Sequence, residues 1–297
     1  MALGFYTACM QERPLAEVAR WAAEHGFSSL DVAIGRRGHL DVAVLDERSA
    51  AGIRRLLESH GLAISSLTYT ANNLHPNPGC REGINAYVQS GVRAAGLLGC
   101  PTVTTLVGRD PTRSIVENIE DAERIFLPMA EAAGDAGIRI AIENAVMEDW
   151  HPDGYPGNLA YSPELWEWLA SIDLFLALDP AHLVTLGIDP VRATQGSVSR
   201  IAHVQANDVE IFPDRRDRYG WPGRAGYRVD PAESRWWSFR LPNLGEVDWP
   251  AVIAALRAGG FTGTVCIENA DSHWSGEADL VEAGLMEAHR ALVALVA

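Results

Sequence analysis

The chain has 297 residues, of which 24 are Lys or Arg and 39 are Asp or Glu, so its formal net charge is −15. Hydrophobic residues make up 47% of the chain, which is typical of a globular protein with a substantial core and excludes intrinsic disorder. The acidic excess argues against nucleic acid as a partner, because phosphate binding requires clustered Lys and Arg.

The cysteines and the N-terminus indicate a soluble, cytoplasmic protein. Cys9, Cys80, Cys100 and Cys266 are scattered with no C-x-x-C pair, as expected of reduced thiols rather than a disulfide framework or a zinc site. The first ten residues lack the basic and apolar segments of a signal peptide. No apolar run approaches the roughly 18 residues of a membrane helix, so no membrane partner is expected.

Short apolar, β-branched runs alternate along the chain with longer segments of helical period. In the first helical segment, Leu15, Val18, Trp21 and Ala22 fall on one face. Strands are predicted over residues 3–7, 29–34, 63–69, 102–107, 139–143, 174–179, 200–206 and 263–268. The predicted helices between the strands include residues 15–25, 42–60, 84–98, 116–136, 163–171, 250–259 and 277–296.

Eight strand–helix alternations predict an α/β protein with a (β/α)8 TIM barrel over residues 1–297. Eight is the number of parallel strands that closes such a barrel, and barrels of about 250 residues form single domains. A doubly wound open sheet is the alternative. It usually carries a glycine-rich phosphate-binding turn after an early strand, and this chain has none.

Two segments, about residues 148–162 and 209–246, interrupt the alternation. Both are rich in aromatic, Pro, Gly and charged residues. Long loops in compact domains usually serve as lids or binding loops. Because these segments follow the fifth and seventh strands, they are expected over the C-terminal face of the barrel, where TIM-barrel active sites lie.

Acidic residues end three of the last four predicted strands. Glu143 closes the fifth, Asp179 the sixth and Glu268 the eighth, and no Arg or Lys ends a neighbouring strand to pair with them. Carboxylates brought together at one end of a barrel are costly to bury unless a cation neutralises them. Oxygen ligands favour Mg²⁺ or Mn²⁺ over zinc, so one of these ions is the predicted cofactor.

A fourth ligand is expected from the seventh strand, which runs I-A-H-V-Q-A-N-D. His203 and Gln205 are two residues apart and therefore face the same side of this strand. Their spacing does not decide which of them would bind the metal.

These motifs resemble those of the xylose-isomerase-like barrels of sugar isomerases and epimerases, most closely between residues 138 and 269. The resemblance implies that Glu143, Asp179, Gln205 and Glu268 bind the metal, with His203 outside the ligand set. That family includes ketose 3-epimerases, hydroxypyruvate isomerase, inosose dehydratase and dehydroshikimate dehydratase. A Gln at this position of the seventh strand resembles hydroxypyruvate isomerase and dehydroshikimate dehydratase, whereas the ketose epimerases have a His there.

The resemblance also implies catalytic roles. Glu143 and Glu268 would flank the sugar, one removing a proton next to a carbonyl and the other returning it. The metal would polarise that carbonyl and stabilise the enediolate. His182, three residues after the metal-binding Asp, would contact a substrate oxygen; the alternative is a polar cap after the strand.

Three further motifs resemble a branch of this family that is similar to subunits of enzymes that cleave 3-keto-C-glycosides. They are N-L-A-Y-S-P-E-L-W at 158–166, D-P-A-H-L-V-T-L-G-I-D at 179–189 and W-W-S-F-R-L-P-N-L-G-E-V-D-W at 236–249. A lyase outcome at the same site is therefore an alternative to isomerisation.

Several other residues near the strand ends are candidates for substrate contact. For Arg240, a loop-anchoring ion pair is an equally good explanation. Trp236 could pack on the barrel rim rather than stack on a sugar. His203 could have an orienting or core position. The full set is Tyr6, Asn144, His203, Asp208, Trp236 and Arg240.

Four functions are compared on this basis. The first is a metal-dependent isomerase or epimerase of a small keto or aldo sugar, and the second a lyase, dehydratase or 3-keto-glycoside-cleaving enzyme. An endonuclease of the same superfamily is disfavoured, because the third and fourth strands end in T-Y-T-A and T-L-V-G without the histidines such enzymes need. A metal-free binding module is the fourth. A homo-oligomer is compatible with each.

Overall fold

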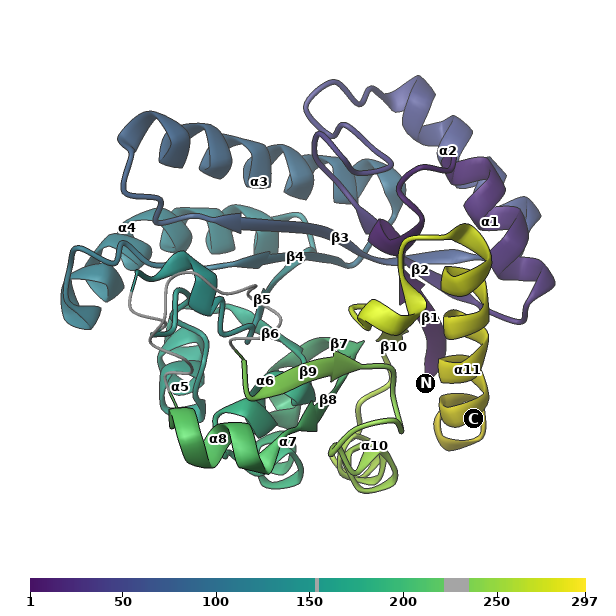
Figure 1. The fold of residues 1–297 in the computed structure, drawn as a ribbon. Helices are drawn as coiled ribbons and strands as arrows, with labels where there is room; N and C mark the ends of the chain where they lie inside the picture. The colour runs from purple at the N-terminus through teal and green to yellow at the C-terminus, as the bar shows by residue number, and fades with distance from the viewer. Residues whose placement is uncertain (153–154, 222–234) are drawn as a thin grey trace.

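Eight parallel strands close into a barrel in the computed structural model, which describes residues 1–152, 155–221 and 235–297 (Figure 1). The strands are hydrogen-bonded in the order β1-β10-β7-β6-β5-β4-β3-β2, which confirms the predicted TIM barrel. Closure joins the first strand to the last, with Phe5 paired to Ile267. The strands are β1 (Ala2–Tyr6), β2 (Ser29–Ala33), β3 (Ala63–Asn72), β4 (Thr102–Leu106), β5 (Arg139–Glu143), β6 (Phe175–Leu178), β7 (Ile201–Ala206) and β10 (Thr264–Ile267).

Helices surround this barrel. They are α1 (Leu15–Glu24), α2 (Glu47–Ser59), α3 (Pro78–Leu98), α4 (Ile115–Asp135), α5 (Pro163–Ser171), α6 (Pro180–Thr185), α7 (Pro190–Ser197), α8 (Pro213–Tyr219), α10 (Trp249–Ala258) and α11 (Ala278–Val296). Short 3-10 turns occur at η1 (Thr7–Met10), η2 (Glu148–Trp150), η3 (Val198–Arg200) and η4 (Ser272–Trp274). Among the described residues, no helix combines the length and hydropathy needed to cross a bilayer.

Two helices, α2 and α3, begin at least five residues away from their predicted starts, and capping explains both differences. The helix predicted from residue 42 begins at Glu47, because the Asp46 side chain accepts a hydrogen bond from Ser49 N–H and ends the preceding loop. The helix predicted from residue 84 begins at Pro78, where Asn77 caps Cys80 N–H and a proline at the first helical position has no N–H to satisfy.

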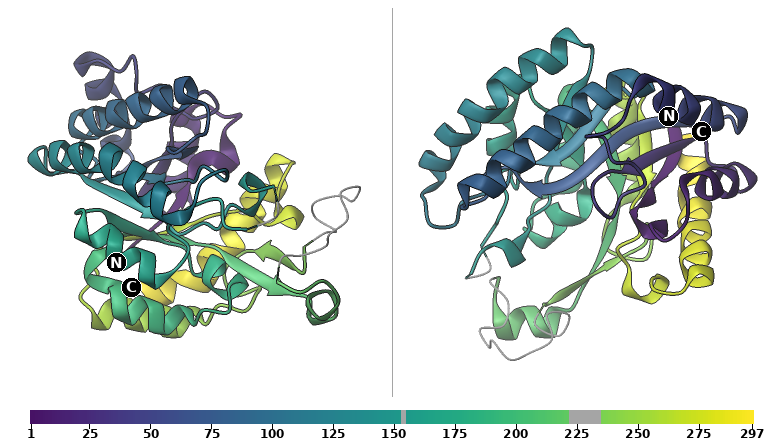
Figure 2. Two further views of the ribbon diagram at one scale, coloured as in Figure 1. Left: turned by 90° about the vertical axis from the view of Figure 1, so that its left-hand side faces the viewer. Right: turned by 90° about the horizontal axis from the view of Figure 1, so that it is seen from above.

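The segment predicted as a loop over 209–246 contains an antiparallel hairpin. Strand β8 (Asp208–Ile211) pairs with β9 (Trp237–Arg240), and α8 follows β8 at the far end of an arm that projects from the barrel (Figure 2). The prediction of a plain loop was therefore wrong for this part. Residues 222–234, and residues 153–154 of the loop predicted at 148–162, lie outside the described part of the chain.

The barrel interior is unusually polar, whereas bulky branched residues fill the interior of most TIM barrels. The Ser66 hydroxyl lies 2.7 Å from the Thr104 hydroxyl, and both side chains are fully buried. Apolar packing occurs instead between the barrel and its helices, where Phe5 meets the edges of Trp21 and Phe27 at centroid distances of 5.7 and 5.0 Å. The core that holds the fold together therefore lies outside the barrel, and the interior is left to polar chemistry.

Close strand packing at Gly4 generates the first prediction. A Cβ at this position would lie 2.5 Å from the Ser29 carbonyl oxygen on β2. Gly4→Ala is therefore expected to lower the free energy of unfolding by about 1–3 kcal/mol, as overpacking does. Chemical denaturation monitored by circular dichroism measures the change.

Gly52 is the matched control, because a Cβ there has no atom within 4 Å and the residue lies inside α2. Gly52→Ala is expected to raise the free energy of unfolding by about 0.5–1 kcal/mol. Equal effects of the two substitutions would contradict the assignment of Gly4 to close strand packing.

Candidate metal and substrate site

Four adjacent strands bring the predicted metal ligands to one end of the barrel. Glu143 is the last residue of β5, Asp179 follows β6, Gln205 lies in β7 and Glu268 follows β10. Because β10, β7, β6 and β5 are consecutive neighbours in the barrel, their carboxyl ends share one rim (Figure 1).

Among the described residues, Glu143, Asp179 and His182 form a group of potential metal ligands, and the predicted ligand Glu268 is not part of that group. One ligand atom from each lies within 4.8 Å of the others, and all three side chains are buried. The His182 Nε2 atom is 3.6 Å from Asp179 Oδ2. Geometry therefore places His182 beside the carboxylates, in addition to its predicted role at the substrate.

Gln205 lies directly against Glu143. The end of its amide is 3.2 and 3.3 Å from the two carboxylate oxygens of Glu143. With its nitrogen facing Glu143, the amide donates to both oxygens; with its oxygen facing them, three oxygen atoms converge as they do around a cation.

The carboxylates carry strongly perturbed pKa values. Burial, followed by the charges of Glu268 and Asp179, raises the pKa of Glu143 well above its usual range. Burial also raises the pKa of Asp179 to about 7, and burial with the charges of Asp179 and Asp31 raises the pKa of Glu268 to about 8. Removing three acids from water penalises their charged forms, and mutual repulsion adds to that penalty.

A divalent cation fits this donor set. In the described part of the chain, no Arg forms an ion pair with Glu143, Asp179 or Glu268, and the sequence contains no lysine. The oxygens of three carboxylates and one amide suit a hard cation, which would supply the missing positive charge.

The sequence analysis missed a fifth ionisable residue, Asp31 on β2. Its carboxylate is fully buried, lies 3.0 Å from His203 Nε2 and accepts a 2.6 Å hydrogen bond from the Thr68 hydroxyl. Because β2 and β7 are not neighbours, the contact with His203 crosses the barrel interior. An aspartate in the middle of the apolar run S-L-D-V-A was the available signal.

The Asp31 contact distinguishes His203 from Gln205. Burial lowers the pKa of His203, but the neighbouring Cys266 and Asp31 outweigh it and raise the pKa to about 10. His203 is thus held as the cationic partner of Asp31, whereas Gln205 lies against Glu143. Of the two residues, Gln205 is therefore the one beside Glu143, and its role as a metal ligand stays a prediction.

Asn144 positions Asp179 rather than facing a substrate. Its side-chain nitrogen donates to the Asp179 carbonyl at 2.8 Å, and its side-chain oxygen accepts from Asp179 N–H at 2.7 Å. Both amide atoms are engaged, which argues against the predicted substrate contact. Asn207, which the sequence analysis did not single out, donates to Asp179 Oδ2 at 3.2 Å.

Asp208 and Arg240 anchor the loop that carries the β8–β9 hairpin. The Asp208 carboxylate accepts from the backbone N–H groups of Val209, Asn243 and Val247 at 2.8–2.9 Å. These contacts hold both ends of the hairpin. They also occupy the carboxylate that was predicted to touch substrate.

The Arg240 guanidinium forms ion pairs with two acids, Glu210 at 2.6 Å and Asp271 at 3.4 Å. It also lies 2.6 Å from His273 Nδ1. Of the two roles considered for Arg240, the structure supports loop anchoring.

Trp236 and Tyr6 differ in their relation to the site. Trp236 is 3% exposed, packs with Val209 and Trp237, and donates its indole N–H to the Trp221 carbonyl, which supports rim packing. Tyr6 ends β1 near the acids: burial, and then the charges of Asp31 and Glu268, raise the pKa of its phenol. Its contact with substrate stays a prediction.

Comparison with known proteins places this geometry in a family context. The family model described as "Xylose isomerase-like TIM barrel" matches residues 19–290. Among curated proteins, the uncharacterized protein YfiH of Bacillus subtilis (strain 168) is 25% identical over 320 residues, covering 94% of this chain and 96% of that protein.

Solved structures share the fold over nearly the whole chain. The probable 3-DHS dehydratase AsbF from Bacillus anthracis has a TM-score of 0.72 at 14% identity, covering 99% of both chains. The IOLI protein with a bound zinc atom has a TM-score of 0.72 at 18% identity, covering 100% of this chain and 98% of that one. D-Psicose 3-epimerase from Clostridium cellulolyticum H10, with D-tagatose, has a TM-score of 0.70 at 14% identity, covering 100% and 99%.

The raised pKa values predict how stability depends on pH in metal-free protein. Folded Asp179 and Glu268 hold their protons up to about pH 7 and 8, whereas in the unfolded chain they release them near pH 4. The folded state therefore binds more protons in this interval, and the free energy of unfolding falls as pH rises. His182, whose pKa is lowered to about 3 mainly by burial, acts in the opposite direction only below about pH 6.5.

Urea denaturation in EDTA is therefore expected to show a lower midpoint at pH 8.5 than at pH 6.5. Glu268→Gln removes one of the titrating groups and should reduce the difference. Added Mn²⁺ should stabilise the protein more at pH 8.5, because metal binding requires deprotonated ligands. His203, whose pKa is raised to about 10, contributes in the same direction above about pH 6.5. A midpoint independent of pH would therefore contradict the raised pKa values of both the acids and His203.

Proposed function

Because the chain belongs to the xylose isomerase-like TIM barrel family, we propose that it is a metal-dependent enzyme acting on a small sugar. Its reaction is isomerisation or epimerisation of a keto or aldo sugar, by proton transfer at the carbon next to a carbonyl. The observation that carries this proposal is the pair of buried carboxylates, Glu143 and Asp179, beside His182, with the half-buried Glu268 following the neighbouring strand β10; all three acids have raised pKa values. The similarity in fold to a D-psicose 3-epimerase supports it.

Glu143, Asp179, Gln205 and Glu268 would hold the metal, for which we propose Mn²⁺ or Mg²⁺ on the basis of the all-oxygen donor set. When bound, the cation polarises the substrate carbonyl and makes the neighbouring C–H bond more acidic. The bound zinc of the IOLI protein supports a divalent metal in a barrel of this kind.

Glu143 and Glu268 are the proposed acid–base pair. Each has a pKa raised above the usual range of a carboxyl group, which suits it to exchange a proton near neutral pH. One removes the proton and the other returns it. The sequence contains no lysine, so no lysine amine competes for the role of base or of Schiff-base nucleophile.

His182 is the proposed donor to a substrate oxygen. Its Nδ1 atom accepts a hydrogen bond from Val146 N–H at 3.4 Å, so the neutral ring carries its proton on Nε2. Burial, and then the charge of Arg235, lowers the pKa of His182 to about 3, which keeps the ring neutral at physiological pH. Phe239 packs its edge against the ring at a centroid distance of 5.3 Å and fixes its orientation.

A lyase or dehydratase is the second candidate. The same base and the same cation would form the carbanion, which then expels a group β to the carbonyl instead of taking back a proton. Similarity in fold to the probable dehydratase AsbF favours this alternative.

The four cysteines are unpaired, in keeping with a reducing compartment, and we propose the cytoplasm as the location of the protein.

Glu268→Gln tests the proposed proton transfer. It keeps the shape of the side chain but removes the base, so exchange of substrate protons with D₂O is expected to fall at least a hundredfold. Each keto sugar of a panel is incubated in D₂O with the Mn²⁺-loaded enzyme. The metal is then removed from the sample, and proton NMR measures the exchange. Glu210→Gln is the control, since Glu210 pairs with Arg240 on the hairpin. Unchanged exchange in Glu268→Gln would remove Glu268 from the mechanism.

Product analysis separates the two proposed reactions. Free ketoses and 3-keto-glucosides are incubated with the Mn²⁺-loaded enzyme and resolved by chromatography. Interconversion of free ketoses without release of a fragment is the expected result for an isomerase or epimerase. Release of an aglycone, or loss of water from the substrate, would instead establish the lyase or dehydratase.

A further inference from the structure

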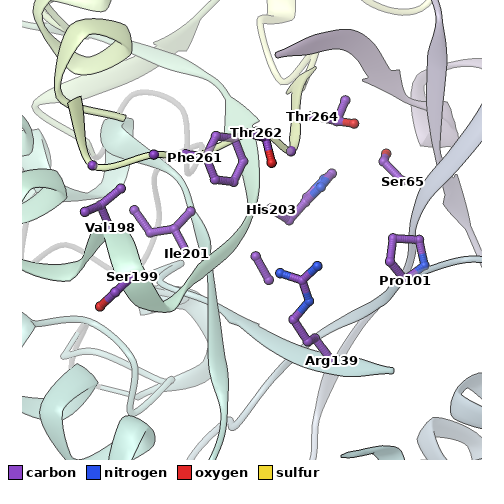
Figure 3. A pocket seen from close by; sticks show the side chains of 14 residues that line it. Ser65, Pro101, Arg139, Val198, Ser199, Ile201, His203, Phe261, Thr262 and Thr264 are labelled. Atoms are coloured by element: carbon purple, nitrogen blue, oxygen red, sulfur yellow. The ribbon is translucent and has the colours of Figure 1, made fainter. Parts of the chain in front are cut away.

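A second recess opens at the other end of the barrel. It has a volume of about 270 Å³, and the residues that begin β5, β7 and β10 line it: Arg139, Ile201 and Thr264 (Figure 3). The proposed metal site lies at the carboxyl ends of the same strands, so the two sites are separated by the length of the barrel. In most TIM barrels this amino-terminal end serves stability.

The charge of this recess is opposite to that of the chain. Acidic residues outnumber basic ones by 39 to 24 in the sequence, yet the lining contains Arg139 and no Asp or Glu. Within the described residues, the Arg139 guanidinium forms no hydrogen bond or ion pair; its one recorded contact is the Phe175 ring, 5.8 Å away. Arg139 is an exposed residue, so the recess presents a solvent-accessible arginine that has no counter-ion among the described residues.

Further hydrogen-bond donors face the same space. The loop before β10 carries Thr262 and Gly263, whose backbone N–H groups have no hydrogen-bond acceptor in the part of the chain that the structure describes. The Thr262 and Thr264 hydroxyls, by the same measure, make no hydrogen bond with described residues. In Figure 3, Arg139 and Thr262 lie on opposite sides of the recess, with His203 between them.

We propose that this recess binds the phosphoryl group of inorganic phosphate or of a small phosphate ester. An arginine fork, backbone N–H groups and hydroxyls are the donors that proteins use for phosphoryl oxygens. They come from β5 on one side of the recess and from the loop before β10 on the other. The volume also leaves room for a small organic group beyond the phosphate.

Arg200 provides a matched control within the same region. Its guanidinium lies 5.5 Å from the same Phe175 ring, but it is paired with Asp173 at 2.9 Å and does not line the recess. Arg139 and Arg200 thus share an aromatic neighbour and a positive charge, and differ in the presence of an acidic partner. A general effect of surface charge would act on both.

The test is isothermal titration of the Mg²⁺-loaded protein with inorganic phosphate and, separately, with glycerol 3-phosphate. Saturable binding of one equivalent is expected, weakened at least tenfold by Arg139→Gln and less than twofold by Arg200→Gln. Arg139→Lys keeps the positive charge but not the two-pronged guanidinium, so its loss of phosphate affinity should lie between those of the other two variants. It replaces Arg139→Gln if that variant does not fold. Tighter binding of the ester would identify a phosphorylated compound as the ligand, and tighter binding of phosphate the free ion.

Three results would overturn the proposal. One is the absence of saturable binding of either probe at millimolar concentration. Another is binding that Arg139→Gln leaves unchanged, because phosphate then occupies the metal site or another surface. The third is an equal loss in the Arg139 and Arg200 variants, which would indicate attraction by net charge alone. None of these results bears on the proposed sugar chemistry at the opposite end.

Discussion

The repulsion among three carboxylates, two of them buried and one half-buried, is the constraint on which the rest of this site depends. Glu143, Asp179 and Glu268 share one end of the barrel without an arginine partner among the described residues. Such a group is tolerated only if some of its members are protonated or if a cation binds between them. Either solution is chemically useful, because it yields carboxyl groups that exchange protons near neutral pH or a site for a divalent metal.

A rigid polar scaffold holds these acids in place. Asn144 binds the backbone of Asp179 through both amide atoms, and Asn207 donates to its carboxylate. Beneath them, the Asp31–His203 pair crosses the barrel interior. Polar residues in the interior cost stability unless they have partners, and here His203 and Thr68 supply them to Asp31. The apolar packing between barrel and helices carries the stability that this interior does not provide.

Much of the fold was predictable because each strand and each helix carries a local signal. Strands of β-branched residues and helices of 3.6-residue period alternate eight times, and the barrel follows from that count. The acids that end strands were recognisable because a carboxylate after an apolar run is unusual. Asp31 was missed for the opposite reason, since a single acid inside a buried strand carries no sign of its partner 172 residues away. The β8–β9 hairpin was missed because its two strands are separated by 25 residues without periodic pattern.

By itself the sequence determined the barrel, and it predicted the end of the barrel that holds the proposed site and three carboxylates proposed to act there. These follow from patterns within single strands and from the rule that parallel strands point the same way. Only the tertiary structure decided the roles of the remaining polar residues. In it, Asn144, Asp208 and Arg240 hold backbone and loops, His203 pairs with Asp31, and Arg139 at the amino end has no counter-ion among the described residues. The physical reason is that a polar side chain acquires its role from the partner it meets, and that partner usually lies far away in the chain.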